Sequence, residues 1–319
     1  MTVDGEADGA APTALEPGDT NAIGRMLGLL GDEWNLLILQ QSLMGADRYG
    51  HFTTALPVSN SVLSKRLRLL VDEGLLARRK NRYLPTARSR SLWPLLLLIW
   101  EWERTWVATH RERLPEMHDE RCGELFSALW RCSACGVPVH GDEVELALGP
   151  SGQWTRSAPA SATRRRSDSQ AGERQAGLFP ETMAVLGNRW AAALLLAAFL
   201  GAARFTDFQA QLGAPPSLLA ERLQTFCAIG VLSTQPARPG GSERVHYLLS
   251  DKGLAFGAVL AAALQWAQHW FVAPEGPAIT LLHKGCGQPF TGELACDRCG
   301  ERLSGAQVRV TAAAVAGTP

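Results

Sequence analysis

The sequence predicts a mainly α-helical protein with small β wings, made of two copies of one unit. With 319 residues, 46% of them hydrophobic, the chain can fill more than one hydrophobic core. An offset of 156 residues places Gly31 and Trp34 on Gly187 and Trp190. After an eight-residue insertion in the second copy the offset becomes 164, and this offset aligns three cysteines of the first copy with three of the second. Two long copies indicate a duplication and not a solenoid, which needs several short repeats.

Composition and motifs exclude several classes of protein. The longest apolar runs, Leu95 to Trp100 and Ala191 to Ala203, are shorter than the roughly 20 residues of a membrane-spanning helix. The acidic first residues lack the features of a signal peptide, so we expect a cytoplasmic protein that does not bind membranes. The sequence has no glycine-rich phosphate loop, nucleophile elbow or metalloprotease helix motif, so we expect no enzymatic activity.

The first copy begins with two helices. Apolar residues from Ile23 to Leu30 follow the helical period and stop at Gly31, which we interpret as a C-terminal cap. Asp32 can accept hydrogen bonds from the free amides of the next helix, which carries Trp34 and ends near Gly45.

A helix-turn-helix is predicted next. A short element around Phe52 and Leu56 leads into a turn at residues 57–59, and a longer helix begins at Asn60 or Ser61. The buried side of this helix has four apolar residues at helical spacing, namely Leu63, Leu67, Leu70 and Val71. A tight turn followed by a capped helix is typical of the helix-turn-helix motif.

The copy closes with a hairpin and a long helix. Residues 75–85 are short and basic and contain Tyr83, which indicates a β wing. In the last helix, Pro94 lies near the first turn, where a missing amide costs little. The tryptophans of this helix lie all around it, namely Trp93, Trp100, Trp102 and Trp106. Such a helix either belongs to the core of its own unit or also packs against the other copy or another chain.

Several short motifs match one known family. In the first copy these are residues 31–34 (GDEW), 48–49 (RY), 60–67 (NSVLSKRL) and 73–76 (EGLL), and in the second copy residues 187–190 (GNRW) and 218–223 (LLAERL). With these motifs each copy resembles the HxlR-type winged helix-turn-helix family of bacterial transcription regulators. The resemblance implies a dimeric DNA-binding regulator without enzymatic activity, in which the helix at residues 60–73 enters the major groove. The first copy departs from the family in its shortened wing, and Thr20 stands where many members have a cysteine, so thiol-based sensing is not carried over.

The helix that starts at Asn60 is the candidate DNA-reading element. With its apolar side buried it leaves one polar stripe, whose hydroxyl and basic groups can bind phosphates or base edges. This stripe consists of Ser61, Ser64, Lys65 and Arg68. The wing beside it carries a basic cluster that we expect along the phosphates, namely Arg78, Arg79, Lys80 and Arg82. The alternative is a basic face that only meets solvent.

The second copy differs at the equivalent stripe. Its residues there are Ser217, Ala220, Glu221 and Gln224, so a carboxylate replaces a lysine. We therefore expect the first copy to supply most of the DNA affinity. Arg222 lies beside this stripe, and the longer second wing retains backbone-contact candidates in Arg238 and Arg244.

Six of the seven cysteines form two groups with the same spacing. These groups are Cys122, Cys132 and Cys135, and Cys286, Cys296 and Cys299. A pair separated by two residues and followed by glycine is typical of a zinc knuckle, and a third thiolate leaves one tetrahedral position for another ligand. His118 and His283 are the candidates for it, although the 164-residue offset places His283 opposite Asp119. We expect two zinc sites, one in each appendage. The alternatives are a thiol redox switch or thiols that are merely buried, as expected for the seventh cysteine, Cys227.

These interpretations divide the chain into seven segments. They are a disordered tail (1–18), a winged helix-turn-helix domain (19–114), a zinc-knuckle-like appendage (115–150), a flexible linker (151–175), a second winged helix-turn-helix domain (176–273), a second appendage (274–311) and a tail (312–319).

The sequence thus predicts a sequence-specific DNA-binding transcription regulator, repressor-like, whose two fused units mimic a dimer. Double-stranded DNA is the expected partner, and a second chain and a small-molecule effector are further candidates. The alternative is a ligand-sensing or protein-interaction adaptor that kept the fold and lost DNA binding in one or both copies.

Overall fold

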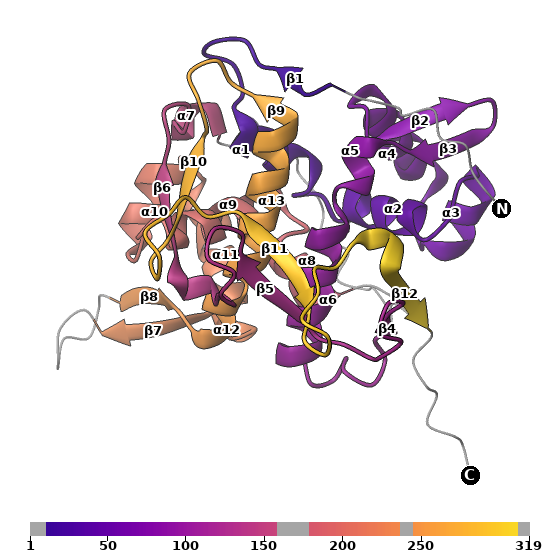
Figure 1. Ribbon diagram of the computed structural model, residues 1–319. Coiled ribbons are helices and arrows are strands. Elements are labelled where there is room, and N and C mark those ends of the chain that lie inside the picture. Colours follow the sequence, from indigo (N-terminus) through magenta and orange to yellow (C-terminus); the bar gives the residue numbers. More distant parts are fainter. Residues whose placement is uncertain (1–10, 158–178, 237–244, 312–319) are drawn as a thin grey trace.

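The structure is a computed structural model that describes residues 11–157, 179–236 and 245–311. Two helical units lie beside each other, the first coloured indigo to purple and the second salmon to orange, and strands of the cysteine-rich segments lie across their junction (Figure 1). Within the described ranges, every helix is too short or too polar to cross a lipid bilayer.

Side-chain caps start several helices of the first unit. Asp32 accepts hydrogen bonds from the amides of Trp34 and Asn35, as predicted, and Ser59 caps the helix that begins at Asn60. The elements of this unit are α1 (Ala22–Leu29), α2 (Glu33–Leu43), α3 (Tyr49–Ala55), α4 (Asn60–Asp72), β2 (Leu76–Arg79), β3 (Arg82–Pro85), α5 (Ala87–Arg90) and α6 (Trp93–Trp106). The antiparallel pair β2–β3 is the predicted wing.

The second unit repeats this order. Asn188 caps α9 as Asp32 caps α2, and Ser250 caps α12 as Thr86 caps α5. Its elements are α8 (Pro180–Val185), α9 (Arg189–Phe199), α10 (Phe205–Leu212), α11 (Pro216–Ala228), β7 (Leu232–Pro236), β8 (Val245–Leu249), α12 (Asp251–Ala255) and α13 (Gly257–Trp270).

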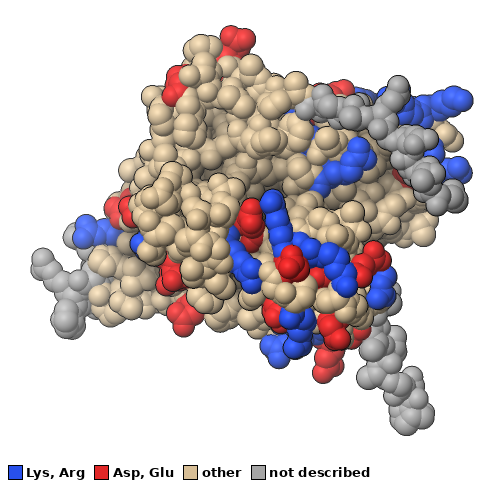
Figure 2. Space-filling model, in the orientation of Figure 1, with Lys and Arg blue, Asp and Glu red and all other residues tan. Residues whose placement is uncertain are grey.

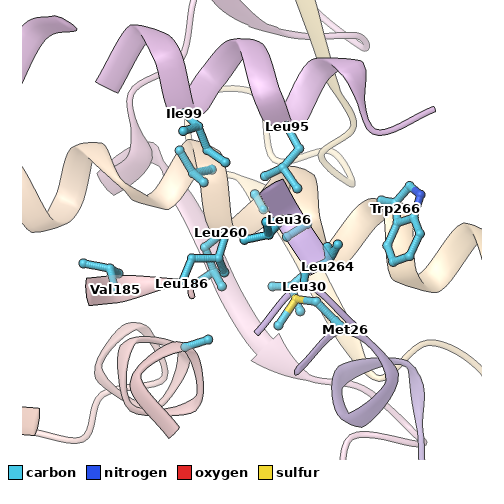
Figure 3. Packing of buried hydrophobic residues seen from close by; sticks show 14 of the residues in the cluster. Met26, Leu30, Leu36, Leu95, Ile99, Val185, Leu186, Leu260, Leu264 and Trp266 are labelled. Atoms are coloured by element: carbon cyan, nitrogen blue, oxygen red, sulfur yellow. The ribbon is translucent and has the colours of Figure 1, made fainter. Parts of the chain in front are cut away.

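One hydrophobic cluster runs through both units. Leu95 and Ile99 of α6 lie in it together with Leu260 and Leu264 of α13 (Figure 3). The long helices of the two copies therefore pack against each other, and their tryptophans do more than fill the core of one unit.

Two equivalent hydrogen bonds reinforce this contact. The indole of Trp102 donates to the carbonyl of Lys252 at 3.0 Å, and the indole of Trp266 donates to the carbonyl of Arg88 at 2.9 Å. Each bond joins one copy to the other, and the 164-residue offset converts one into the other. The units are thus related by a pseudo-twofold axis.

Gly31 has a different role from the predicted helix cap. It is not among the glycines with a left-handed φ, and a Cβ there would lie 2.8 Å from Cα of Arg189. Beside it Asp32 and Asn188, which occupy equivalent positions, form an antiparallel bridge. Glycine suits this position because the Leu27 carbonyl of its own copy and the backbone of the other copy both lie close to it.

The cysteine-rich strands pair between copies, which corrects the prediction of two separate appendages. The strands are β4 (Glu116–Asp119), β5 (Ala128–Cys132) and β6 (Val144–Leu148) in the first copy, and β10 (Ile279–His283), β11 (Gly292–Cys296) and β12 (Val308–Thr311) in the second. Antiparallel pairs form between β4 and β12, β5 and β11, and β6 and β10. At the centre Trp130 lies opposite its own equivalent, Leu294. We call these six strands and their loops the Cys-rich module.

Two segments expected to lack structure are partly ordered. Within the predicted tail, β1 (Thr13–Ala14) pairs in parallel with β9 (Phe271–Val272) of the second copy. Within the predicted linker, Ser151 is buried and its carbonyl accepts a hydrogen bond from the Asn21 side chain at 2.7 Å, and α7 (Trp154–Ser157) follows. The remaining elements are the short 3-10 turns η1 (Gly141–Glu143) and η2 (Gly305–Gln307). Residues 158–178 of the linker lie outside the described part.

Candidate DNA-binding face and cysteine clusters

The predicted polar stripe lies on the free face of α4. Its members are all exposed, namely Ser61, Ser64, Lys65 and Arg68, while Leu63, Leu67 and Leu70 are buried on the opposite face. The Tyr49 hydroxyl of α3 donates to the carbonyl of Asn60 at 3.0 Å and lies 3.2 Å from Ser64 Oγ. The start of α4 is therefore held by the preceding helix, as a reading helix requires.

An ion pair fixes α4 to α2. A guanidinium nitrogen of Arg66 lies 2.5 Å from Asp32 Oδ2, with side-chain exposures of 21% and 8%. The second copy has Asn188 in place of Asp32, and Arg222 instead contacts its neighbour Glu221 at 3.5 Å. Arg222, a predicted DNA contact, is thus partly neutralised within its own helix.

The first wing presents a basic surface. Arg78, Arg79 and Lys80 are exposed, and blue side chains gather over this wing at the upper right of Figure 2. Arg82, predicted to lie along the phosphates, already has a partner in the protein, because its Nε donates to Asp47 Oδ2 at 2.6 Å. Arg48 was not predicted: it is exposed at the start of α3 and its backbone bridges to Arg82, so it adds charge beside the wing.

The second unit lacks an equivalent basic face within its described residues. On α11, Ser217, Glu221 and Gln224 are exposed, so the stripe is neutral to acidic. Arg238 and Arg244 lie outside the described residues.

The first cysteine cluster joins both copies. Cys132 and Cys135 of the first copy meet His283 and Cys286 of the second, with all four ligand atoms within 4.8 Å of one another. His283 Nδ1 lies 3.1 Å from the sulfur of Cys286 and 3.5 Å from that of Cys135. Three sulfurs and one imidazole in this arrangement are the donor set of a tetrahedral zinc site.

The second cluster is its counterpart under the pseudo-twofold. Cys122 of the first copy meets Cys296 and Cys299 of the second, and the fourth group is Asp119. Cys122 and Cys296 have their sulfurs 3.9 Å apart, and Cys299 Sγ lies 3.4 Å from Asp119 Oδ2. The prediction that each copy holds its own three cysteines is therefore wrong.

His118 lies outside the cluster to which we assigned it. Successive side chains of a strand point to opposite faces, and β4 directs Asp119 inward, fully buried, while His118 lies 4.0 Å from Glu116. The 164-residue offset already placed Asp119 opposite His283, and that signal was the correct one.

The ionisable groups of the two clusters have pKa values shifted in both directions. Burial opposes ionisation of Asp119, but hydrogen bonds from Arg121 and Cys299 hold its pKa below the ordinary value. Burial likewise opposes ionisation of Cys132, yet the amides of Cys135 and Ala134 lower the pKa of its thiol. By contrast, burial and the neighbouring thiols raise the pKa of Cys296 to about 11. A divalent cation among the sulfurs would reverse this preference for the thiol form.

A family model of the HxlR-like helix-turn-helix matches residues 29–111 and 185–275. The chain belongs to the HxlR-like family. The two matched regions cover the predicted duplication and more than half of the sequence.

Relatives of this HxlR-like protein match about one unit each. An uncharacterized HTH-type transcriptional regulator of Mycobacterium tuberculosis (strain H37Rv) is 32% identical over 124 residues, which are 39% of this chain and 78% of the relative. The uncharacterized HTH-type transcriptional regulator YvaP of Bacillus subtilis (strain 168) is 31% identical over 96 residues, 29% of this chain and 85% of the relative.

Two solved structures are also similar. PA1607, described as a candidate transcription factor, is 32% identical with a TM-score of 0.36 and covers 40% of this chain and 89% of its own. PA1374 of Pseudomonas aeruginosa, described likewise, is 27% identical with a TM-score of 0.33 and covers 43% of this chain and 92% of its own.

The clustered cysteines lie outside the HxlR-like matches. All six fall after residue 111 or after residue 275, where the two matched regions end. The Cys-rich module is therefore distinct from the part of this chain that the family model describes.

Proposed function

We propose that this HxlR-like protein is a sequence-specific, repressor-like transcription regulator that binds double-stranded DNA as a fused pseudo-dimer. The observation that carries the proposal is α4, whose exposed polar stripe lies beside a basic wing and whose position is fixed by the Arg66–Asp32 ion pair. The description of its relatives as HTH-type transcriptional regulators supports it. Such a regulator works in the cytoplasm, and no catalytic step is part of the proposal.

In this proposal the first unit supplies most of the DNA affinity. Lys65 and Arg68 can each replace counterions at a phosphate or donate to a base edge, whereas Glu221 repels phosphate. The wing residues Arg78, Arg79 and Lys80 add phosphate contacts that carry little sequence information.

We propose further that both cysteine clusters hold zinc. Each offers four protein ligands with no position left for a substrate, so the metal would have a structural role. Because each cluster takes ligands from both copies, zinc would hold the two units in one arrangement. Elemental analysis of the purified protein should find about two zinc ions per chain. Metal-free protein with all six thiols freely titratable would contradict the proposal.

A ligand-sensing adaptor is the second candidate. A cavity of about 190 Å³ between the units favours it, because tryptophans and one carboxylate line part of its wall, namely Trp102, Trp106, Trp130 and Glu101. A compact aromatic or apolar molecule matches this lining.

Selection of DNA by the zinc-loaded full chain distinguishes the two candidates. The protein is mixed with a library of random duplexes at about 0.15 M ionic strength, and bound DNA is recovered and sequenced over several rounds. A regulator enriches one motif. If no motif emerges and all binding vanishes at this ionic strength, the adaptor is favoured.

A further inference from the structure

The two cysteine clusters are equivalent in position and different in chemistry. Each has three cysteines, but the fourth group is His283 in one and Asp119 in the other, at positions related by the 164-residue offset. Side-chain burial does not separate them, since both are almost inaccessible. The difference lies in the donor atom.

A second position differs together with the first. Two residues after Asp119 is Arg121, whose amide donates to Asp119 Oδ1 at 3.1 Å and whose Nε lies 3.4 Å from the same oxygen. Two residues after His283 is Gly285, where an added Cβ would lie 3.0 Å from His283 Nε2. The carboxylate thus has a cation beside it, whereas the imidazole has a glycine at the equivalent position, where even a Cβ would crowd the ring.

This pairing has a simple electrostatic reason. Zinc with three thiolates and a neutral imidazole carries one net negative charge, whereas a carboxylate in place of the imidazole adds another. Arg121 offsets that added charge: its amide and Nε bind Oδ1, and a terminal guanidinium nitrogen lies 3.5 Å from Oδ2, which is also 3.4 Å from the sulfur of Cys299. Arg121 therefore has the place of an outer-shell partner that orients a metal ligand.

We propose that these clusters are two unequal zinc sites, a permanent one at Cys132, Cys135, His283 and Cys286, and an exchangeable one at Asp119, Cys122, Cys296 and Cys299. Asp119 Oδ2 is the fourth ligand of the exchangeable site and Arg121 its positioning residue. The inference rests on the proposed function, in which both clusters hold zinc. The site that contains Asp119 is weaker because thiolate and imidazole suit zinc better than a carboxylate oxygen, and because Arg121 must stay in place to orient that oxygen.

Chelator competition on the zinc-loaded full chain tests the proposal. The chromogenic chelator 4-(2-pyridylazo)resorcinol should remove zinc in two steps of one ion each, with affinities that differ by about 10-fold or more. D119H/R121G, which copies the second-copy pair into the first, should make both sites tight. H283D/G285R, the reverse exchange, should make both weak, and H118A should behave as the unchanged chain.

A second readout does not depend on the variants folding. Cobalt added to the metal-free unchanged chain should first give the absorption of a three-sulfur, one-nitrogen site and then that of a three-sulfur, one-oxygen site. Two equal sites, or loss of the His283 site first, would overturn the inequality while leaving the zinc proposal intact. A chain that binds no zinc or cobalt would overturn both.

Discussion

Lys65 and Arg68 carry the positive charge of the α4 stripe, and both are exposed. Replacement of both by alanine should weaken DNA binding about 10-fold or more and lower the logarithmic salt slope by roughly one per lost phosphate contact. Fluorescence anisotropy at several salt concentrations measures both quantities. Q224A on the equivalent stripe of α11 is the matched control and should change little. Equal losses in the two proteins would show that the second unit reads DNA despite Glu221.

Asp32 combines two roles that asparagine can separate. It caps α2 and pairs with Arg66 of α4, while Asn188 in the second copy provides only the cap. D32N should therefore keep the helix start and lower the free energy of unfolding by about 1–3 kcal/mol, because a largely buried guanidinium loses its charged partner.

Urea denaturation measures this loss, and DNA affinity should fall with it because α4 is less firmly held. The control is N188D, which offers Arg222 a partner and should not destabilise the protein. Unchanged stability in D32N would show that the ion pair contributes nothing.

At the scale of elements, two glycines at the end of α1 should respond oppositely to alanine: Gly28 lies inside the helix and Gly31 lies just beyond it. G31A should destabilise the protein by about 1–3 kcal/mol, since its Cβ would meet the carbonyl oxygen of Leu27 and would lie 2.8 Å from Cα of Arg189 in the second copy. G28A, inside the helix and with no neighbour within 4 Å, should instead stabilise by about 0.5–1 kcal/mol. Thermal unfolding of both variants gives the comparison, and a harmless G31A would contradict the close contact of the copies.

The Cys-rich module should depend on metal as one element. Removal of zinc by a strong chelator should lower Tm by about 5 °C or more and expose residues 115–150 and 274–311 to protease together, because every strand pair joins the two segments. The helical circular dichroism should largely remain, since the units share an apolar core of their own. Cleavage of one segment alone would contradict the pairing of strands between the two copies.

Local signals predicted the helices and wings well. Asp32 as a cap, the turn before Asn60 and the basic hairpin each follow from residues within one turn of the chain. The pairing of strands between the two copies has no local signal in the sequence. A strand and its equivalent in the other copy carry the same pattern and offer the same backbone groups, so either could be the partner. The choice between His118 and Asp119 depended on the pleat of β4, which only the pairing with β12 fixes.

The whole molecule carries α4 and its equivalent α11 on one chain. If the pseudo-twofold that relates the long helices also relates α4 and α11 on DNA, protection should extend over two half-sites roughly 34–36 Å apart. Hydroxyl-radical footprinting shows the spacing, and titration should give one chain per site. Protection of one half-site alone, or two chains per site, would contradict the fused pseudo-dimer.

Strand exchange also imposes an order on biosynthesis. When β5 leaves the ribosome, its partner strand β11 has not yet been made. The paired residues Cys132 and Gly292 are 160 residues apart along the chain. The strands β4, β5 and β6 therefore stay unpaired until the second copy is made. Unpaired strand edges can pair with the same segment of another nascent chain. Slow translation between residues 150 and 290 would lengthen that wait. Codon choice in this interval should therefore influence the ratio of chains whose strands pair internally to oligomers whose strands pair between chains.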